Sequence, residues 1–580
     1  MTRSRLASGI FVSVMVSGVL VALPGLSARA ATNDCPAAFP TASAVDGVTG
    51  TGYTVERGTT PDAFTAKILG RITDGIAPGI DMIMADLSSP ALTRAGGVWA
   101  GMSGSPVYAA DGRLIGSVSY GLASSSPIAG ITPAEEMKKL LKPTTAPVPA
   151  KTRIKVSPAS AERIARTGKV TAEAAQSTGF RQLLMPVSVS GVSKNSAKFL
   201  KELKGTAGVQ VRSNGARIQA TPSSPSEITA GSNFAAALSY GDVSIAGVGT
   251  TTFVCDGQAV AFGHPFFDLS NSEYTAHAAT SVYVQPDPVW GPFKVANPEG
   301  PVGVVDRDRT TGLRAELGAK PKGAFPITTS LVPNGEAPVT GSTIGVYQPY
   351  AADISALHLQ ANIVKALGGQ GRGSAALTFT ITGRTAAGTP FSLVRSDHYS
   401  DPYDISYAAA DDLYYNIEPM IDQDFKDVTI TSVNITGTVS DSVKQYKVTA
   451  VKMYKNGKWV PQKGSIATKA GATVYRQITL TKVRSSETAI LKLKVKIPAR
   501  TEGSVGTLTI SDGRASNVTD DEPKSFTGLL KQLADSPTND TIAGTLMLSN
   551  DDSPIVTVTK VKADAPIEEY IRDIRLRVKY

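Results

Sequence analysis

Short runs in which apolar and polar residues alternate fill much of the chain. Between residues 51 and 87 these runs are TGYTVERG, FTAKILGRI and GIDMIMADL, separated by glycine, proline and aspartate. Beyond about residue 340 they include ALTFTITGR, DVTITSVNITG, QYKVTAVKMY and ILKLKVKIP, and the pair Asn456-Gly457 marks a hairpin turn. An alternation with period two is typical of strands with one buried face. The pattern predicts a mainly β protein that is almost purely β after residue 340.

Helical periodicity is limited to a few segments. Residues 133–141 form one of them, with Glu135 and Glu136 near its start and lysines near its end, charges that suit the helix dipole. Residues 526–533, FTGLLKQL, form a second short amphipathic helix. A proline-rich linker at 142–150 precedes two short helices and a strand-helix-strand pattern. We expect an α/β insert at about residues 151–230.

The stretch of residues 96–141 contains the most informative motif, GMSGSP, with Ser103 between two glycines. Glycines allow a tight turn that exposes a serine hydroxyl and points neighbouring backbone N–H groups at one spot. Alternating apolar residues and the turn pair Asp111-Gly112 follow, so the turn leads into a β-hairpin. The nucleophile turn of α/β-hydrolases leads into a helix instead, which argues against that fold. The motif indicates an acyl-transfer nucleophile.

This stretch resembles the SpoIVB family of bacterial serine peptidases, through GG, GMSGSP, a DG hairpin, LIG, a glycine-bearing loop and a following helix. The resemblance implies that Ser103 is the nucleophile. Ser105 is the alternative hydroxyl, but it precedes Pro106 and lacks the second glycine.

A second segment, residues 231–317, resembles the histidine-bearing part of the same family. It contains a strand, a turn at Gly249, another strand, an Asp256-Gly257 hairpin, and His264 between glycine and proline. The resemblance assigns the role of general base to His264. His277 is the alternative.

The third member of such a triad is a carboxylate that orients the histidine. In the family this aspartate lies shortly before the serine, which favours Asp86 at the end of MIMAD, with Asp81 as the competitor. The N–H groups of Gly101 and Ser103 are expected to form the oxyanion hole.

The family's founding members run histidine, aspartate, serine, whereas the candidates here run Asp86, Ser103, His264. The resemblance therefore implies a permuted, chymotrypsin-like double β-barrel, whose site in the cleft between barrels tolerates a changed chain order. We expect this peptidase domain at residues 31–340. Residues 341–580 are expected to form C-terminal β-sandwich modules of the immunoglobulin-like kind, with a division into 341–425 and 426–580.

Residues 1–30 have the features of an export signal: Arg3 and Arg5, an apolar run at 10–23, and Ala28-Arg29-Ala30 before the mature start. No later run reaches transmembrane length. The sequence predicts a secreted protein, extracellular or associated with the cell wall, with no membrane span in its mature form.

The two cysteines, Cys35 and Cys255, fit an oxidising compartment and are expected to form one intramolecular disulfide; the alternative is two buried thiols that do not meet. Neither has the spacing of a metal ligand, and no metal or organic cofactor is expected. The formal charge of +9 for the whole chain is scattered along strands, so nucleic-acid binding is not indicated.

The sequence thus predicts a secreted serine endopeptidase whose substrate is a protein or peptide. The family resemblance implies limited or regulatory cleavage. The C-terminal modules are expected to bind a cell-wall or surface partner or to space the enzyme from a surface. The alternative is a non-catalytic secreted scaffold or binding protein that retains the peptidase fold.

Overall fold

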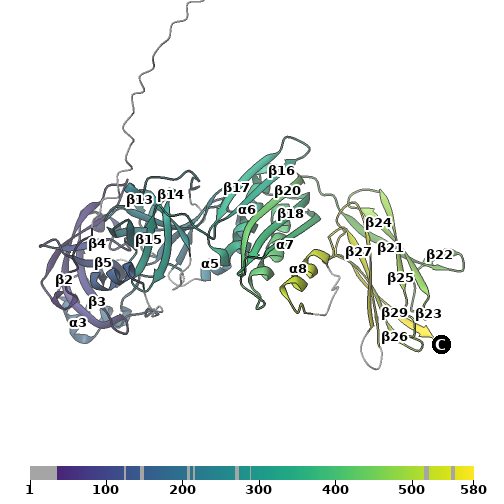
Figure 1. Ribbon diagram of the computed structural model, residues 1–580, viewed down its shortest axis with the longest axis horizontal. Helices are drawn as coiled ribbons and strands as arrows, with labels where there is room; N and C mark the ends of the chain where they lie inside the picture. The colour runs from purple at the N-terminus through teal and green to yellow at the C-terminus, as the bar shows by residue number, and fades with distance from the viewer. Residues whose placement is uncertain are drawn as a thin grey trace, which may run out of the picture.

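The computed structural model describes residues 35–122, 126–143, 149–205, 209–212, 216–267, 273–287, 289–514, 522–549 and 555–580. Three regions follow one another along the long axis of the molecule (Figure 1). Two β-barrels occupy one end, a sheet with helices lies in the middle, and further sheets form the C-terminal end. The predicted export signal at residues 1–30 lies outside the described residues.

The first barrel is a closed ring of six strands in the order β4-β1-β2-β3-β6-β5, with β5 pairing back to β4. Residues alternate between its two sides: on β3, Ile83, Ala85 and Leu87 join the barrel core, whereas Met82 and Met84 face outward. The strands are β1 (Thr49–Thr54), β2 (Asp62–Ala77), β3 (Ile80–Ser88), β4 (Pro106–Ala109), β5 (Leu114–Gly121) and β6 (Ile128–Pro133).

The second barrel is also a closed ring of six strands, in the order β10-β13-β14-β15-β12-β11 with β11 pairing back to β10. The double barrel predicted from the sequence is therefore confirmed. Its strands are β10 (Asn233–Gly241), β11 (Ile245–Cys255), β12 (Gln258–Ala261), β13 (Tyr274–Gln285), β14 (Phe293–Arg309) and β15 (Gly312–Leu317).

The segment between the barrels contributes to both of them. β7 (Arg181–Gln182) pairs with β5 of the first barrel, while β8 (Met185–Val189) pairs with β11 of the second and with β9 (Val209–Arg212). Two helices pack on the outward side of the first barrel, α3 (Pro158–Ala165) and α4 (Ala172–Thr178). The other short helices of the N-terminal half are α1 (Pro90–Ala95), α2 (Ala134–Lys138), α5 (Lys201–Gly205) and the 3-10 turns Thr41–Ser43, Lys139–Leu141, Lys194–Ala197 and Pro225–Glu227.

A disulfide joins Cys35 to Cys255, which are 220 residues apart. Cys255 ends β11 and is packed among buried residues of both halves, including Leu114, Met137 and Val260. The bridge therefore ties the first described residues to the second barrel. The predicted disulfide is therefore confirmed, and the alternative of two separate thiols is wrong.

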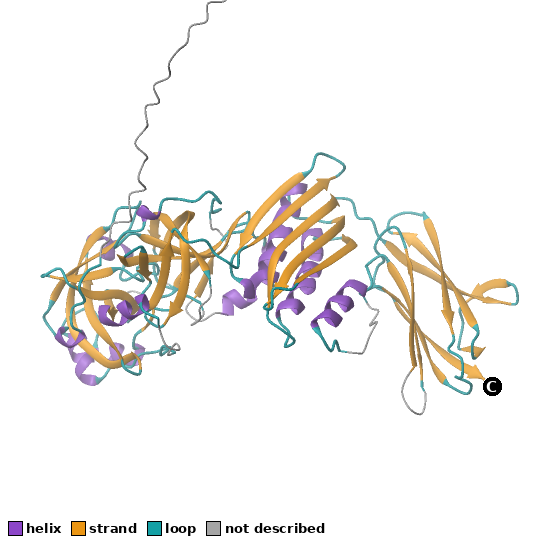
Figure 2. Ribbon diagram, in the orientation of Figure 1, coloured by secondary structure: helices purple, strands orange, loops and turns teal. Residues whose placement is uncertain are grey.

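The middle region contradicts the expectation of an almost purely β chain after residue 340. Two 17-residue helices, α6 (Ala351–Leu367) and α7 (Ile405–Ile421), pack together and against its sheet (Figure 2). No β-sandwich module is formed at 341–425, because helices cover that sheet. The sheet continues from the second barrel through β17 (Val339–Gly345), β16 (Phe325–Pro333), β20 (Val428–Ser440), β18 (Gly373–Thr385) and β19 (Pro390–Asp401), and a 3-10 turn, Gln348–Tyr350, precedes α6.

The C-terminal unit, residues 443–580, contains a four-stranded and a five-stranded sheet that share one apolar core. The predicted Asn456-Gly457 hairpin joins β21 to β22, and both turn residues have positive φ. One sheet is β22 (Lys458–Pro461), β21 (Tyr446–Lys455), β24 (Thr473–Lys482) and β25 (Thr488–Lys496). The other is β23 (Ile466–Lys469), β29 (Ile571–Lys579), β26 (Val505–Asp512), β27 (Thr541–Leu548) and β28 (Ile555–Lys562), and α8 (Phe526–Asp535) contacts β19.

Candidate active site

Ser103 lies in the loop that connects α1 to β4 of the first barrel. The glycines on either side have φ of +100° at Gly101 and +98° at Gly104, a region that residues with side chains avoid. A Cβ at Gly104 would lie 1.9 Å from the carbonyl oxygen of Thr250, and one at Gly101 would lie 2.8 Å from Cβ of Lys294. The motif therefore requires both glycines for backbone conformation and for close packing.

The second barrel holds this loop through strand β11. The Thr250 N–H donates to the Ser103 carbonyl oxygen at 2.8 Å, and its hydroxyl donates to the Gly101 carbonyl oxygen at 3.1 Å. The Thr252 hydroxyl donates to the Gly104 carbonyl oxygen at 2.8 Å. The position of the serine thus depends on the register of β11.

His264 follows β12 and meets Ser103 across the two barrels. Its Nε2 lies 2.7 Å from Ser103 Oγ, and its Nδ1 lies 2.7 Å from the Pro265 carbonyl oxygen. A carbonyl oxygen only accepts, so Nδ1 carries the proton in the neutral ring and Nε2 accepts from the serine hydroxyl. Complete burial lowers the pKa of His264 to about 4 from its ordinary 6.5. The ring is therefore a neutral proton acceptor at neutral pH.

The carbonyl of Pro265 is itself held in place by two further residues. It accepts from the Gln182 side-chain amide at 3.0 Å. Asp308, on β14, accepts from the next two backbone N–H groups, Phe266 at 3.0 Å and Phe267 at 2.8 Å. These contacts fix the segment whose carbonyl orients His264.

Sequence reasoning missed Asp308, although it is fully buried. It lies in the charged run DRDR at residues 306–309, beside a Thr-Thr-Gly turn, which is typical of a solvated strand end. Tyr274 OH also donates to its carboxylate at 3.3 Å. Asp306 and Asp308 both stand in this charged run, and the sequence does not show which of the two is buried.

Asp86 is not placed beside His264, so its predicted orienting role is corrected. Its carboxylate contacts Lys169 Nζ at 2.7 Å. Because Ile83, Ala85 and Leu87 point into the barrel, the alternation of β3 turns Asp86 to the outer side.

The competitor and the two alternative residues also lie away from the Ser103–His264 pair. Asp81 contacts Arg71 at 3.2 Å. The Ser105 hydroxyl donates to Thr250 Oγ1 at 3.4 Å, and His277 lies between the Glu299 carbonyl oxygen and the Thr275 hydroxyl. The structure therefore brings together Ser103 and His264 and none of the other candidates.

The two N–H groups predicted to form an oxyanion hole, those of Gly101 and Ser103, have no acceptor within the described part of the chain. The neighbouring N–H groups differ: Met102 donates to Trp99 and Gly104 donates to Val118. Two donors beside the serine hydroxyl are thus left for a ligand oxygen.

A buried lysine that the sequence did not single out packs beside this loop. Lys294 donates its backbone N–H to the Ala100 carbonyl oxygen at 2.9 Å, and its Nζ donates to Asn233 Oδ1 at 2.8 Å. Burial lowers the pKa of Lys294 to about 7. Its stem fills the space that a side chain at Gly101 would need.

Comparison with known proteins does not identify the chain. No protein-family model, no curated protein and no solved structure matches it. Among the residues that the structure describes, no three His, Cys, Asp or Glu side chains are grouped to hold a metal ion. No helix of the described ranges is long and apolar enough to cross a membrane.

Proposed function

We propose that the chain is an exported serine endopeptidase in which Ser103 is the nucleophile and His264 the general base. The observation that carries the proposal is the 2.7 Å hydrogen bond between Ser103 Oγ and His264 Nε2, two residues 161 apart in sequence and carried by different barrels. Two unpartnered N–H groups beside the hydroxyl support the same reaction. The similarity of GMSGSP and of the His264 segment to SpoIVB-type peptidases points to the same residues.

In the proposed reaction, Ser103 Oγ attacks the carbonyl carbon of the scissile peptide while His264 Nε2 takes its proton. The N–H groups of Gly101 and Ser103 donate to the oxyanion of the tetrahedral intermediate. His264 then gives the proton to the leaving amine, and the acyl-enzyme forms. Water, deprotonated by the same nitrogen, hydrolyses the ester and restores the serine.

The orienting partner of His264 in this proposal is the Pro265 carbonyl, with Asp308 and Gln182 as positioning residues. The carbonyl fixes the productive tautomer, but it carries no full charge to stabilise the imidazolium. A histidine whose pKa is lowered to about 4 is also a weaker base than one near 7. We therefore expect slow turnover, which suits limited or regulatory cleavage rather than digestion.

A second candidate function, the non-catalytic scaffold, is favoured by one specific observation. The residues Ser103 and His264 are both 0% exposed. Attack on a peptide needs an approach path to Oγ, so a productive enzyme must open this site when substrate binds. A non-catalytic scaffold does not need the Ser103 hydroxyl to become accessible.

The order of Ser103 before His264 supports a permuted form of the chymotrypsin-like double barrel. The serine comes from the first barrel along the chain and the histidine from the second, the reverse of the order in the founding SpoIVB-type peptidases. The interface bonds made by Thr250 and Thr252 join the barrels without regard to which comes first.

Labelling with a fluorophosphonate, followed by peptide mapping, tests the proposal. We expect the native protein to be labelled at Ser103, and Ser103→Ala and His264→Ala to abolish labelling. Ser105→Ala is the matched control and should be labelled normally, because its hydroxyl contacts Thr250 rather than His264. Labelling of Ser103→Ala at the rate of the wild type refutes the assignment, and no labelling of the folded wild type favours the scaffold.

A further inference from the structure

Positive charge is concentrated in the C-terminal unit. Residues 443–580 contain 23 Lys and Arg against 14 Asp and Glu, a formal charge of +9 that equals the formal charge of the whole chain. Residues 1–442 are therefore balanced in formal charge. Any attraction of this protein for a polyanion is expected to lie in its C-terminal unit.

Within this unit the four-stranded sheet is the most one-sided in charge. Strands β21, β22, β24 and β25 contain nine Lys and Arg and no Asp or Glu. On β25, Lys492, Lys494 and Lys496 are exposed, while Leu493 and Val495 between them are fully buried. Residues two apart on a strand lie about 7 Å apart on one face. The three lysines form a row with no carboxylate partner in the described ranges.

Three aromatic rings continue this row across the sheet. The ring centroids of Tyr454 and Trp459 are 5.2 Å apart, and those of Tyr454 and Tyr475 are 6.5 Å apart. Tyr475 pairs directly with Lys494, so both side chains are on the same face. Tyr454 is 51% exposed and Tyr475 is 39% exposed. A band of rings and lysines therefore crosses all four strands on the outer face of the sheet.

We propose that this lysine–aromatic face (Tyr454, Trp459, Tyr475, Lys492, Lys494 and Lys496) binds an anionic polysaccharide. The rings offer apolar surfaces with polar tips for the C–H faces and hydroxyls of sugars. The lysines supply point charges for carboxylate or phosphate groups on the same polymer. The rings are tilted by 61° and 74° to one another, so the surface suits a single flexible chain rather than a flat crystalline layer.

The choice of a polysaccharide over a nucleic acid rests on the export signal that residues 1–30 predict. Stacking rings and lysines also serve single-stranded nucleic acid, so that polymer is one arm of the test. Binding here does not require Ser103 or His264, so its outcome is independent of the proposed peptidase activity.

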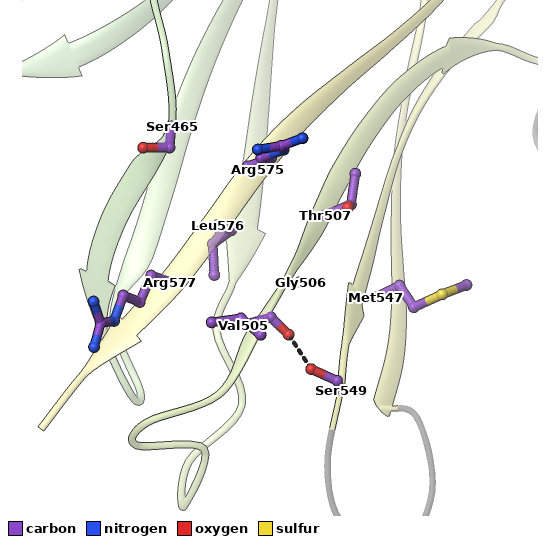
Figure 3. Close-up of a pocket in the computed structure, with 9 residues that line it drawn as sticks. All are labelled: Ser465, Val505, Gly506, Thr507, Met547, Ser549, Arg575, Leu576 and Arg577. Carbon is purple, nitrogen blue, oxygen red and sulfur yellow. Dashed lines mark hydrogen bonds between the residues drawn. The ribbon is translucent and has the colours of Figure 1, made fainter.

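The opposite sheet of the same unit provides a matched control. Figure 3 shows a hollow on the five-stranded sheet where Arg575 and Arg577 lie beside Val505 and Gly506. The hollow has a volume of about 530 Å³, and its lining includes Met547 but no aromatic ring. Neither arginine has a partner within the structure's described residues. Lys579 lies on the same side of β29, so Arg575, Arg577 and Lys579 can be replaced together without changing the rings.

The test is a titration of the full chain with polygalacturonate, a phosphate-bearing mannan, neutral dextran and single-stranded oligo-dT, followed by Trp fluorescence and affinity electrophoresis. We expect one or both anionic glycans to bind, and dextran and oligo-dT to bind at least about tenfold more weakly. The variant K492Q/K494Q/K496Q and the variant Y454A/Y475A should each lower glycan affinity about tenfold.

The control variant R575Q/R577Q/K579Q removes the same charge from the other sheet and should change the affinity less than about threefold. Equal losses of glycan affinity in the two triple variants would mean that the glycan is attracted by the net charge of the unit, and this result would overturn the proposed binding face. Retained affinity in Y454A/Y475A, preference for oligo-dT, or no binding of either glycan also overturns it. Unchanged thermal unfolding in each variant separates lost binding from lost folding.

Discussion

The buried histidines of the folded chain are predicted to lower its stability between pH 6.5 and pH 4. Three of its four histidines, His264, His277 and His358, are fully buried. Burial lowers the pKa of each from the ordinary 6.5 to about 4. Above pH 6.5 these rings are neutral in both the folded and the unfolded chain, so they cause no pH dependence there.

As the pH falls below 6.5, the unfolded chain takes up protons that the folded chain cannot, and the free energy of unfolding decreases. A lowering of the pKa from 6.5 to about 4 corresponds to about 3 kcal/mol for each histidine when the transition is complete. Three such groups give an upper limit of about 10 kcal/mol, comparable to the whole stability of a typical domain. Buried Asp397 offsets part of this loss, because burial raises its pKa to about 7 and the folded chain then binds that proton more tightly than the unfolded chain. Below pH 4 the folded rings are protonated too, and this contribution levels off.

The assay is urea unfolding followed by far-ultraviolet circular dichroism at a series of pH values from 7.5 to 4.5. The variant His277→Gln should be less stable at pH 7.5 but should lose about a third less free energy on acidification. His398→Gln, at the histidine that is not fully buried, controls for removal of a histidine as such. A His277→Gln variant that loses as much unfolding free energy as the wild type between pH 6.5 and 4.5 would refute the reasoning.

Three further changes test the positioning of the site. Asp308→Asn should lower the free energy of unfolding by about 2 kcal/mol and slow fluorophosphonate labelling of Ser103. Asp306→Asn should leave labelling unchanged, and equal effects of the two variants on labelling would exclude a role of Asp308 in positioning His264. Cys35→Ser should lower the free energy of unfolding by up to about 5 kcal/mol, and reductant should have the same effect on the wild type in a thermal melt. Gly104→Ala should lower stability by about 2 kcal/mol or more and abolish labelling, because its Cβ meets the Thr250 carbonyl; a labelled, fully stable variant would contradict the loop geometry.

The candidate pair was predicted through the resemblance of two sequence segments to SpoIVB-type peptidases, and the local conformation of both segments agrees with it. Glycines with positive φ surround Ser103, and His264 follows a strand after an Asp-Gly hairpin, so local conformation and chemistry agree. The orienting groups could not be predicted in the same way. The Pro265 carbonyl is a backbone atom. Asp308 is buried, whereas Asp306 lies in a register shift of β14 and pairs with Arg314, and the sequence does not mark that shift.

The error at Asp86 and the missed helices have different physical causes. Asp86 shares its side of β3 with Met82 and Met84, which are as fully buried as Ile83 and Ala85, so period two in the sequence could not show which side faces the barrel core. Helix α6 is buried on most of its surface between the sheet and α7, so it lacks the polar stripe that marks a surface helix. Its runs of apolar residues then resemble strands.

The hairpin of β11 and β12 determines the relative position of the two candidate catalytic groups. Strand β11 supplies Thr250 and Thr252, which hold the backbone on both sides of Ser103, and β12 leads directly to His264. A slip of one residue along β11 would turn both threonines to the other face and release the serine loop. The disulfide at Cys255 anchors the end of β11 beside the hairpin turn and opposes such a slip. One hairpin therefore positions both Ser103 and His264. The distance between them depends on the register of this hairpin and does not require a particular order of the two barrels in the chain.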